Sequence, residues 1–209
     1  MELNTFQTIL NTIANAMETP IMIILIVMLA FAVFCIGWVL AEALGERRHM
    51  NYSMPKLLDQ LKAGPEDLQE QIKKSGLLYR QKDALLELTA HPDLSRKMLA
   101  GLEENLLEKE QSHYEAVLNV TGLLSKLAPM AGLLGTLVPL GPGIIALGQG
   151  DTMTLSASML TAFDTTIAGL LVAAVCLIIH TLRKRWYNRY MSDLETLADC
   201  VVEMETSEA

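Results

Sequence analysis

Lysine and arginine are absent from two long parts of the sequence, residues 1–46 and 127–182, although the 209-residue chain contains 16 of them. The sequence is also poor in aromatic residues, at 5%, and in cysteine and histidine, with three and four residues. The cysteines and histidines lie too far apart for the spacing of a metal site, and there is no glycine-rich nucleotide-binding loop or nucleophile constellation. We therefore expect no cofactor and no enzymatic activity.

Hydrophobic residues, in contrast, make up 51% of the chain, with a mean hydropathy of +0.31. The run Pro20–Ala41 carries no charge and is long enough to cross a hydrocarbon core of about 30 Å as a helix. Two further runs occupy Leu127–Leu147 and Met159–Leu182, the second with a single charge at Asp164. Three such runs leave too little polar sequence to cover them in a soluble protein. The predicted fold class is an all-α membrane protein with three transmembrane helices.

The basic residues orient these helices. They fall between Arg47 and Lys126 and between Arg183 and Arg189. Short segments rich in lysine and arginine stay in the cytoplasm. We therefore expect a multi-pass protein of the inner membrane with its N-terminus outside and its C-terminus in the cytoplasm, and Arg183–Arg185 as a topology anchor at the lipid headgroups. The net charge of −8 argues against nucleic acid as a partner.

Seven segments follow from this topology. They are an outer-face amphipathic segment (1–19), transmembrane helix 1 (20–44), a cytoplasmic helical domain (45–120), transmembrane helix 2 (121–148), an outer hairpin (149–156), transmembrane helix 3 (157–182) and a cytoplasmic tail (183–209). The first segment could equally be a plain extension of transmembrane helix 1. Within the cytoplasmic domain, prolines and glycines predict short helices at about 55–62, 65–74 and 82–90.

A long stalk helix is predicted after Pro92, because no strong helix breaker follows it before the second transmembrane helix. The leucines at 99, 102, 106 and 107 fall on one side of this helix, and the glutamates at 103, 104, 108 and 110 fall largely on the other. A helix of about 40 residues that runs into transmembrane helix 2 would be roughly 60 Å long, and half of it would project from the bilayer as the stalk. Such a stalk would contact neighbouring chains; the alternative is a solvated hairpin without a partner.

The second and third transmembrane helices carry small and polar residues that a lipid-facing helix does not need. Gly132 and Gly135 permit close helix packing, and the string Pro139–Gly143 is expected to kink or interrupt the second helix. In the third helix, Asp164 and Thr165 project from a small, hydroxyl-rich face. The opposite face is apolar, with Met159, Leu160, Phe163, Ile167, Leu170, Leu177 and Ile178. A charge in a membrane is costly, so Asp164 either coordinates an ion or bonds a neighbouring helix; the threonines have the same two interpretations.

Two strings carry a resemblance to a known family. LAPMAGLLGT (residues 127–136) resembles the second-span signature of the MotA/TolQ/ExbB proton channel family, and AFDTTIAGLLVAA (residues 162–174) is similar to its third-span string. The three-span layout with a long stalk also resembles TolQ and ExbB. The resemblance implies a homopentamer in membrane lipid, around a pore that holds two copies of a single-span ExbD/TolR/MotB-like protein. It implies that H⁺ flow drives mechanical work in this complex.

The resemblance also implies roles for individual residues. Thr136 and Thr166 match pore-facing threonines of the family, and Pro129 matches the proline at its pore entrance. Three residues match its packing glycines: Gly132, Gly135 and Gly169. Together with Thr136 and Thr166, Thr165 and Asp164 complete the predicted ion pathway.

The chain departs from the family pattern in its PLGPG string and in the carboxyl of Asp164, where the family usually has an apolar residue. Na⁺ is therefore an alternative coupling ion. Two other functions also remain open. One is a membrane scaffold without transport. The other is an intramembrane aspartyl protease, because the string LGQGD contains a Gly-x-Gly-Asp motif and Asp151 and Asp164 would be its two acids.

Overall fold

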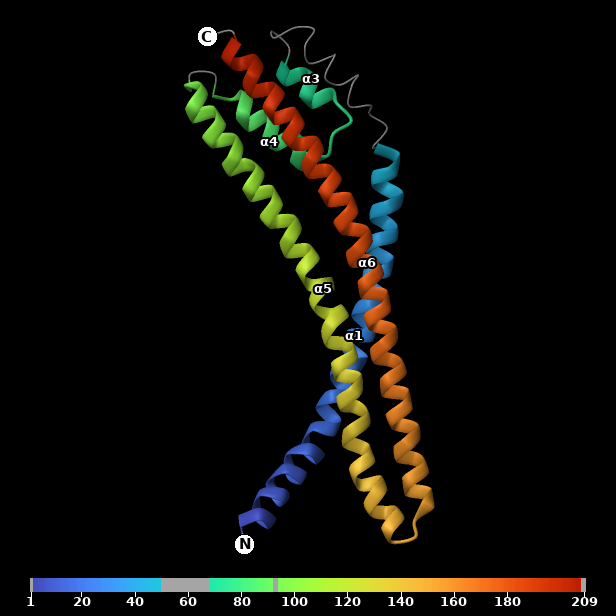
Figure 1. Ribbon diagram of the computed structural model, residues 1–209. Coiled ribbons are helices and arrows are strands. Elements are labelled where there is room, and N and C mark those ends of the chain that lie inside the picture. The colour runs from blue at the N-terminus through green and yellow to red at the C-terminus, as the bar shows by residue number, and fades with distance from the viewer. Residues whose placement is uncertain (1, 50–67, 92–93, 208–209) are drawn as a thin grey trace. The chain divides into compact units, whose positions relative to one another are not determined.

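The structure, a computed structural model, describes residues 2–49, 68–91 and 94–207. These residues form helices only: α1 (Glu2–His49), α3 (Leu68–Lys74), α4 (Tyr79–Thr89), α5 (Arg96–Gly148) and α6 (Thr152–Ser207) (Figure 1). Three of them, α1, α5 and α6, are long and apolar enough to cross a membrane. The predicted all-α fold with three such helices is confirmed. The predicted helix at 55–62 lies outside the described residues.

Helix α1 is continuous from Glu2 through Pro20 to His49. The N-terminal segment is therefore helical and joins the first apolar helix without a break. Its buried residues recur at steps of three, four or seven positions and form one face: Ile21, Leu25, Ala32, Cys35 and Val39. Most of the remaining surface is exposed and apolar, with Ile26, Val33 and Phe34 each at least 60% exposed. This distribution is typical of a helix that meets its own chain on one side and lipid on the other.

Helix α5 confirms the prediction of a single long helix after Pro92. It contains Pro129, Pro139 and Pro142, so of the two outcomes predicted for Pro139–Gly143, a kink or an interruption, the interruption does not occur. A proline removes only the hydrogen bond to the carbonyl four residues earlier, and the bonds of the flanking residues keep the helix together. Pro139 and Pro142 are three residues apart, so both lost bonds fall on nearly the same side of the helix.

A three-residue turn joins α5 to α6. Gly150 adopts a φ of 84°, its N–H bonds the Leu147 carbonyl at 3.0 Å, and the Asp151 N–H bonds the Ala146 carbonyl at 2.9 Å. This is a Schellman motif, in which glycine supplies the left-handed residue. Asp151 then caps α6, because its Oδ1 accepts the backbone N–H groups of Met153 and Thr154. The bonds from Thr154 and Met153 lower the pKa of Asp151. Residues 152–156, predicted to lie in the hairpin, are already helical.

Helix α6 continues far beyond the third apolar run, to Ser207. The sequence analysis assigned residues 183–209 to a tail without a predicted structure. Five of its apolar residues are buried at helical spacing: Tyr187, Tyr190, Leu194, Leu197 and Val201. Their alternating steps of three and four residues are the signal in the sequence that predicts this helix.

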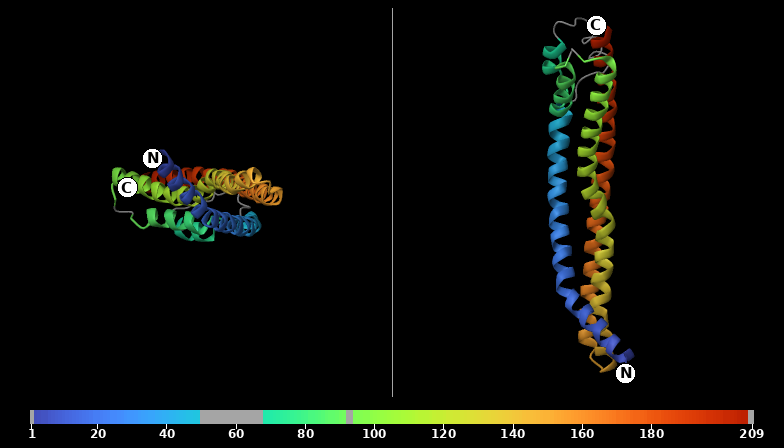
Figure 2. Two further views of the ribbon diagram at one scale, coloured as in Figure 1. Left: turned by 90° about the horizontal axis from the view of Figure 1, so that it is seen from below. Right: turned by 90° about the vertical axis from the view of Figure 1, so that its left-hand side faces the viewer.

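The chain divides into two units, and α1, α5 and α6 contribute to both. The span unit consists of Met1–Val39 and Asn119–Thr181. Within it, α5 and α6 run side by side in opposite directions (Figure 1 and Figure 2). Its core is small and draws on all three helices: Ala32, Ala128, Val172 and Cys176.

The polar unit consists of Leu40–Leu118 and Leu182–Ala209. Its core brings together α3 and α4 with the beginning of α5 and the end of α6, through residues such as Ile72, Leu85, Leu99 and Leu197. Gln81, 1% exposed, donates from Nε2 to the Tyr190 carbonyl at 3.0 Å and so ties α4 to α6. Arg80 of α4 forms a bidentate ion pair with Glu110 of α5, at 2.8 and 2.9 Å.

Candidate ion pathway

Glycines bring the backbones of α5 and α6 into direct contact in the span unit. A Cβ at Gly169 would lie 2.6 Å from the Ala128 carbonyl oxygen and 2.9 Å from Gly132 Cα. A Cβ at Gly132 would in turn lie 3.1 Å from the Thr165 carbonyl oxygen. In lipid, where burial of apolar side chains gives no driving force, such close approach is a main source of helix association. The two helices are therefore held at short range by residues without side chains.

Thr165 lies inside this contact. It is 8% exposed, and a Cβ at Gly135 would lie only 2.7 Å from Thr165 Cβ. Its Oγ1 donates to the Ala162 carbonyl at 2.9 Å. The same contact extends outward to Gly143, which faces Ser158, and in the other direction to Gly122, which faces His180. Neither of these two glycines is predicted from the sequence to be a packing glycine.

The hydroxyls of Thr136 and Thr166 both bond their own helix. Thr136 Oγ1 donates to the Leu133 carbonyl at 2.7 Å, and Thr166 Oγ1 donates to the Ala162 carbonyl at 3.1 Å. Because the hydroxyl proton is used in each bond, the remaining lone pairs of each oxygen are acceptors only. These threonines can therefore present oxygen to a cation or to a hydrated proton.

Asp164 lies on a different side of α6 from Thr166, because residues two positions apart in an α-helix are separated by about 200° around its axis. The exposed Asp164 borders a cavity of about 280 Å³ between α1 and α6. Residues of both helices line this cavity: Met22, Leu25, Ile26 and Leu29 from α1, and Thr161, Asp164, Thr165 and Ala168 from α6. The structure therefore brings Asp164 together with Thr161 and Thr165, whereas Thr136 and Thr166 do not line the cavity.

The apolar face predicted for the third span is exposed in the structure. Phe163, Ile167 and Ile178 are each more than half exposed. The exposed face continues on α5, where Leu133, Leu137 and Ile144 are at least 59% exposed. A surface of this kind meets lipid or other apolar helices.

The two acids of the protease hypothesis are far apart. Asp151 precedes α6 and Asp164 lies within it, 13 positions later in the sequence. At a rise of 1.5 Å per residue, that separates them by roughly 20 Å along the helix. Two carboxyls at this distance cannot share a proton or activate one water together. Asp151 is instead occupied as the N-cap of α6.

The sequence profile of the MotA/TolQ/ExbB proton channel family matches residues 67–196, which is more than half of the chain. The chain belongs to this family. No match was found among curated proteins. The region that matches the MotA/TolQ/ExbB family contains all of α5 and the α6 residues Thr165 and Gly169, which contact it in the span unit. The general role of this membrane protein is therefore that of an ion channel, as in the rest of the MotA/TolQ/ExbB family.

Proposed function

We propose that this chain is the ion-conducting subunit of an energy-transducing complex of the inner membrane, in which H⁺ flow drives mechanical work through a single-span ExbD/TolR-like partner. The observation that carries this proposal is the backbone contact of α5 and α6 at Gly132 and Gly169, inside the region that matches a proton channel family. At these two glycines the contact leaves no room for a side chain between the helices. It therefore holds the threonines beside it in fixed positions.

The proposed ion pathway comprises Thr165 and Asp164, which line the cavity between α1 and α6, together with Thr136 and Thr166, which lie outside it. The three hydroxyls donate to backbone carbonyls, so each oxygen can accept a hydrogen bond from a hydrated proton. Pro129 stands at the pore entrance in this proposal. H⁺ is the proposed coupling ion. Na⁺ is the alternative, which the oxygen atoms of Asp164 and Thr161 beside one cavity favour.

The proposed assembly is a homopentamer around two copies of the single-span partner, with no nucleic acid. Two adjacent helices cannot enclose a pore, so a pathway along α5 and α6 requires several copies of the chain or a partner. The exposed apolar surfaces of both helices supply area for these contacts. The basic residues of the polar unit support an orientation with that unit in the cytoplasm and the N-terminus outside.

A scaffold without transport is the competing function. The hydroxyls of Thr136 and Thr166 each donate a hydrogen bond to a carbonyl of their own helix, as the hydroxyl of a purely structural threonine does. This observation favours the scaffold. The two functions predict different effects when Thr166 loses its hydroxyl oxygen. A scaffold needs only the size of the side chain, which valine keeps.

The test is Thr166→Val in the complex purified through a tagged copy of this chain and reconstituted in liposomes. We expect proton uptake to fall by roughly tenfold with assembly unchanged, because one lost hydrogen-bonding group at a narrow point costs on the order of 1.4 kcal/mol. Thr181→Val is the matched control, since Thr181 also bonds its own helix, at the Leu177 carbonyl, but lies outside the proposed pathway. Equal uptake by both variants and the unaltered complex would contradict the proposal and favour the scaffold.

A further inference from the structure

The buried side of α5 in the polar unit carries two glutamates among its leucines. Leu99, Glu103, Leu106 and Glu110 follow at steps of four, three and four residues, which place them on one face. Glu103 is only 9% exposed and Glu110 only 8%. The sequence analysis assigned both glutamates largely to the polar side of the helix, and the structure shows that this assignment is wrong. Glu104 and Glu108 lie on the exposed side, as predicted.

The two buried glutamates have opposite surroundings. Glu110 is neutralised by Arg80, which donates to both of its carboxylate oxygens. Glu103 instead lies beside Asp199 and Glu195 of α6, whose negative charges act on its carboxyl. The buried residues of α3 and α4 carry no charge: Gln81 and Thr89 are polar, and the others, such as Ile72 and Leu85, are apolar. A hydrogen bond between two carboxyls requires a proton on one of them, because two ionised carboxylates repel each other.

We propose that the α5–α6 contact of the polar unit is a proton-operated junction, closed while Glu103 and Asp199 share a proton and loosened when both are ionised. With the orientation proposed above, this junction faces the cytoplasm and responds to cytoplasmic pH. It lies outside the proposed ion pathway, so its test does not depend on ion conduction.

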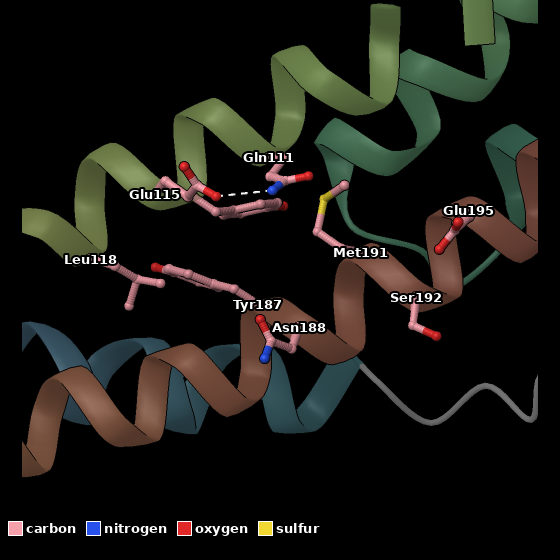
Figure 3. A pocket seen from close by; sticks show the side chains of 9 residues that line it. Gln111, Glu115, Leu118, Tyr187, Asn188, Met191, Ser192 and Glu195 are labelled. Carbon is pink, nitrogen blue, oxygen red and sulfur yellow. Dashed lines mark hydrogen bonds between the residues drawn. The ribbon is translucent and has the colours of Figure 1, made fainter. Parts of the chain in front are cut away.

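The pH range follows from the surroundings of Glu103. Burial, followed by the charge of Asp199, raises the pKa of Glu103 from 4.5 to about 7. The folded chain therefore keeps this proton at pH values where the unfolded chain has released it. The stabilising effect of the proton is complete below the ordinary pKa and is lost as the pH rises through about 7. Glu195 also lines a groove of about 270 Å³ beside Tyr187 and Ser192 (Figure 3).

The test is a distance measurement in the full chain by electron spin resonance. Spin-labelled non-natural amino acids replace Met98 of α5 and Thr196 of α6, both of which are exposed. We expect the distance between the labels to lengthen or broaden between about pH 6 and pH 8. In Glu103→Gln, which keeps the size and the hydrogen-bonding capacity of the protonated acid, we expect the short distance at both pH values. Glu104→Gln, on the exposed side of the same turn, is the control and should behave like the unaltered chain.

Asp199→Asn is the second variant and carries the test if Glu103→Gln does not fold. Its amide can donate to ionised Glu103, so the junction should stay closed at both pH values. A distance that does not change with pH in the unaltered chain would overturn the proposal. So would a pH response that persists in Glu103→Gln and Asp199→Asn.

Discussion

At Gly169 the backbone of α6 lies so close to α5 that an added Cβ would be 2.6 Å from the Ala128 carbonyl oxygen. The neighbouring atom belongs to the backbone and cannot rotate away. A side chain at this position therefore has to push the two helices apart. At Gly141, in contrast, an added Cβ would meet nothing within 4 Å.

We therefore predict opposite effects for two chemically identical substitutions. Gly169→Ala should destabilise the chain by about 1–3 kcal/mol, the usual cost of overpacking. Gly141→Ala should be neutral or stabilising, because alanine is favoured over glycine inside a helix by roughly 1 kcal/mol. Thermal unfolding of both variants in the same detergent measures the difference. Equal melting temperatures would show that the α5–α6 contact is looser than described.

The sequence shows which polar residues of the spans are unusual, but it does not show which residues surround them. Asp164 and Thr166 stand out because charges and hydroxyls are rare there, yet they lie on different sides of α6. Glu103 and Glu110 were placed on the polar side because glutamates are usually exposed. Their burial depends on α4 and α6, which supply Arg80 and Asp199 from distant parts of the sequence. Periodicity within one helix contains no information about such partners.

At the scale of whole helices, an ion pair ties α1 to α6 within the polar unit. Arg183 donates to Glu42 Oε2 from Nη2 at 2.6 Å and from Nε at 3.1 Å, and the Tyr187 hydroxyl lies 3.3 Å from the other carboxylate oxygen. The side chains of Arg183 and Glu42 are only 7% and 14% exposed. The basic cluster Arg183–Arg185 was predicted to be a topology anchor. Arg183 has this structural contact, whereas Lys184 and Arg185 are exposed.

Arg183→Ala should cost about 3–5 kcal/mol, because it leaves the Glu42 carboxylate buried without its partner. The double variant Glu42→Gln with Arg183→Met removes both charges and should recover most of this loss. Lys184→Ala, at the exposed neighbour, should change little. Chemical denaturation monitored by circular dichroism compares the three variants. A double variant that is no more stable than Arg183→Ala would contradict the pairing.

The long helices are the part of the fold that the sequence predicts best. The part of α5 that precedes Pro129 follows from a hydrophobic pattern without breakers, and the apolar run in α6 follows from its length. The continuity of α5 through Pro139 and Pro142 is one of two outcomes that the sequence allows, because a proline inside a helix either kinks or breaks it. The helical tail after Leu182 was overlooked, although its buried residues recur at helical spacing.

For the whole molecule, membership of the MotA/TolQ/ExbB family and the exposed apolar faces of α5 and α6 support an assembly in which this chain is one of several subunits. A separate proton-operated junction in the polar unit would let the pH of one compartment act on that assembly without touching its ion pathway.

The most direct test of the proposed complex is native mass spectrometry of a tagged copy of this chain, extracted from its own membrane in mild detergent. The account predicts a particle with five copies of the chain and two copies of a second, single-span protein. A monomer or dimer that carries no single-span protein would contradict it.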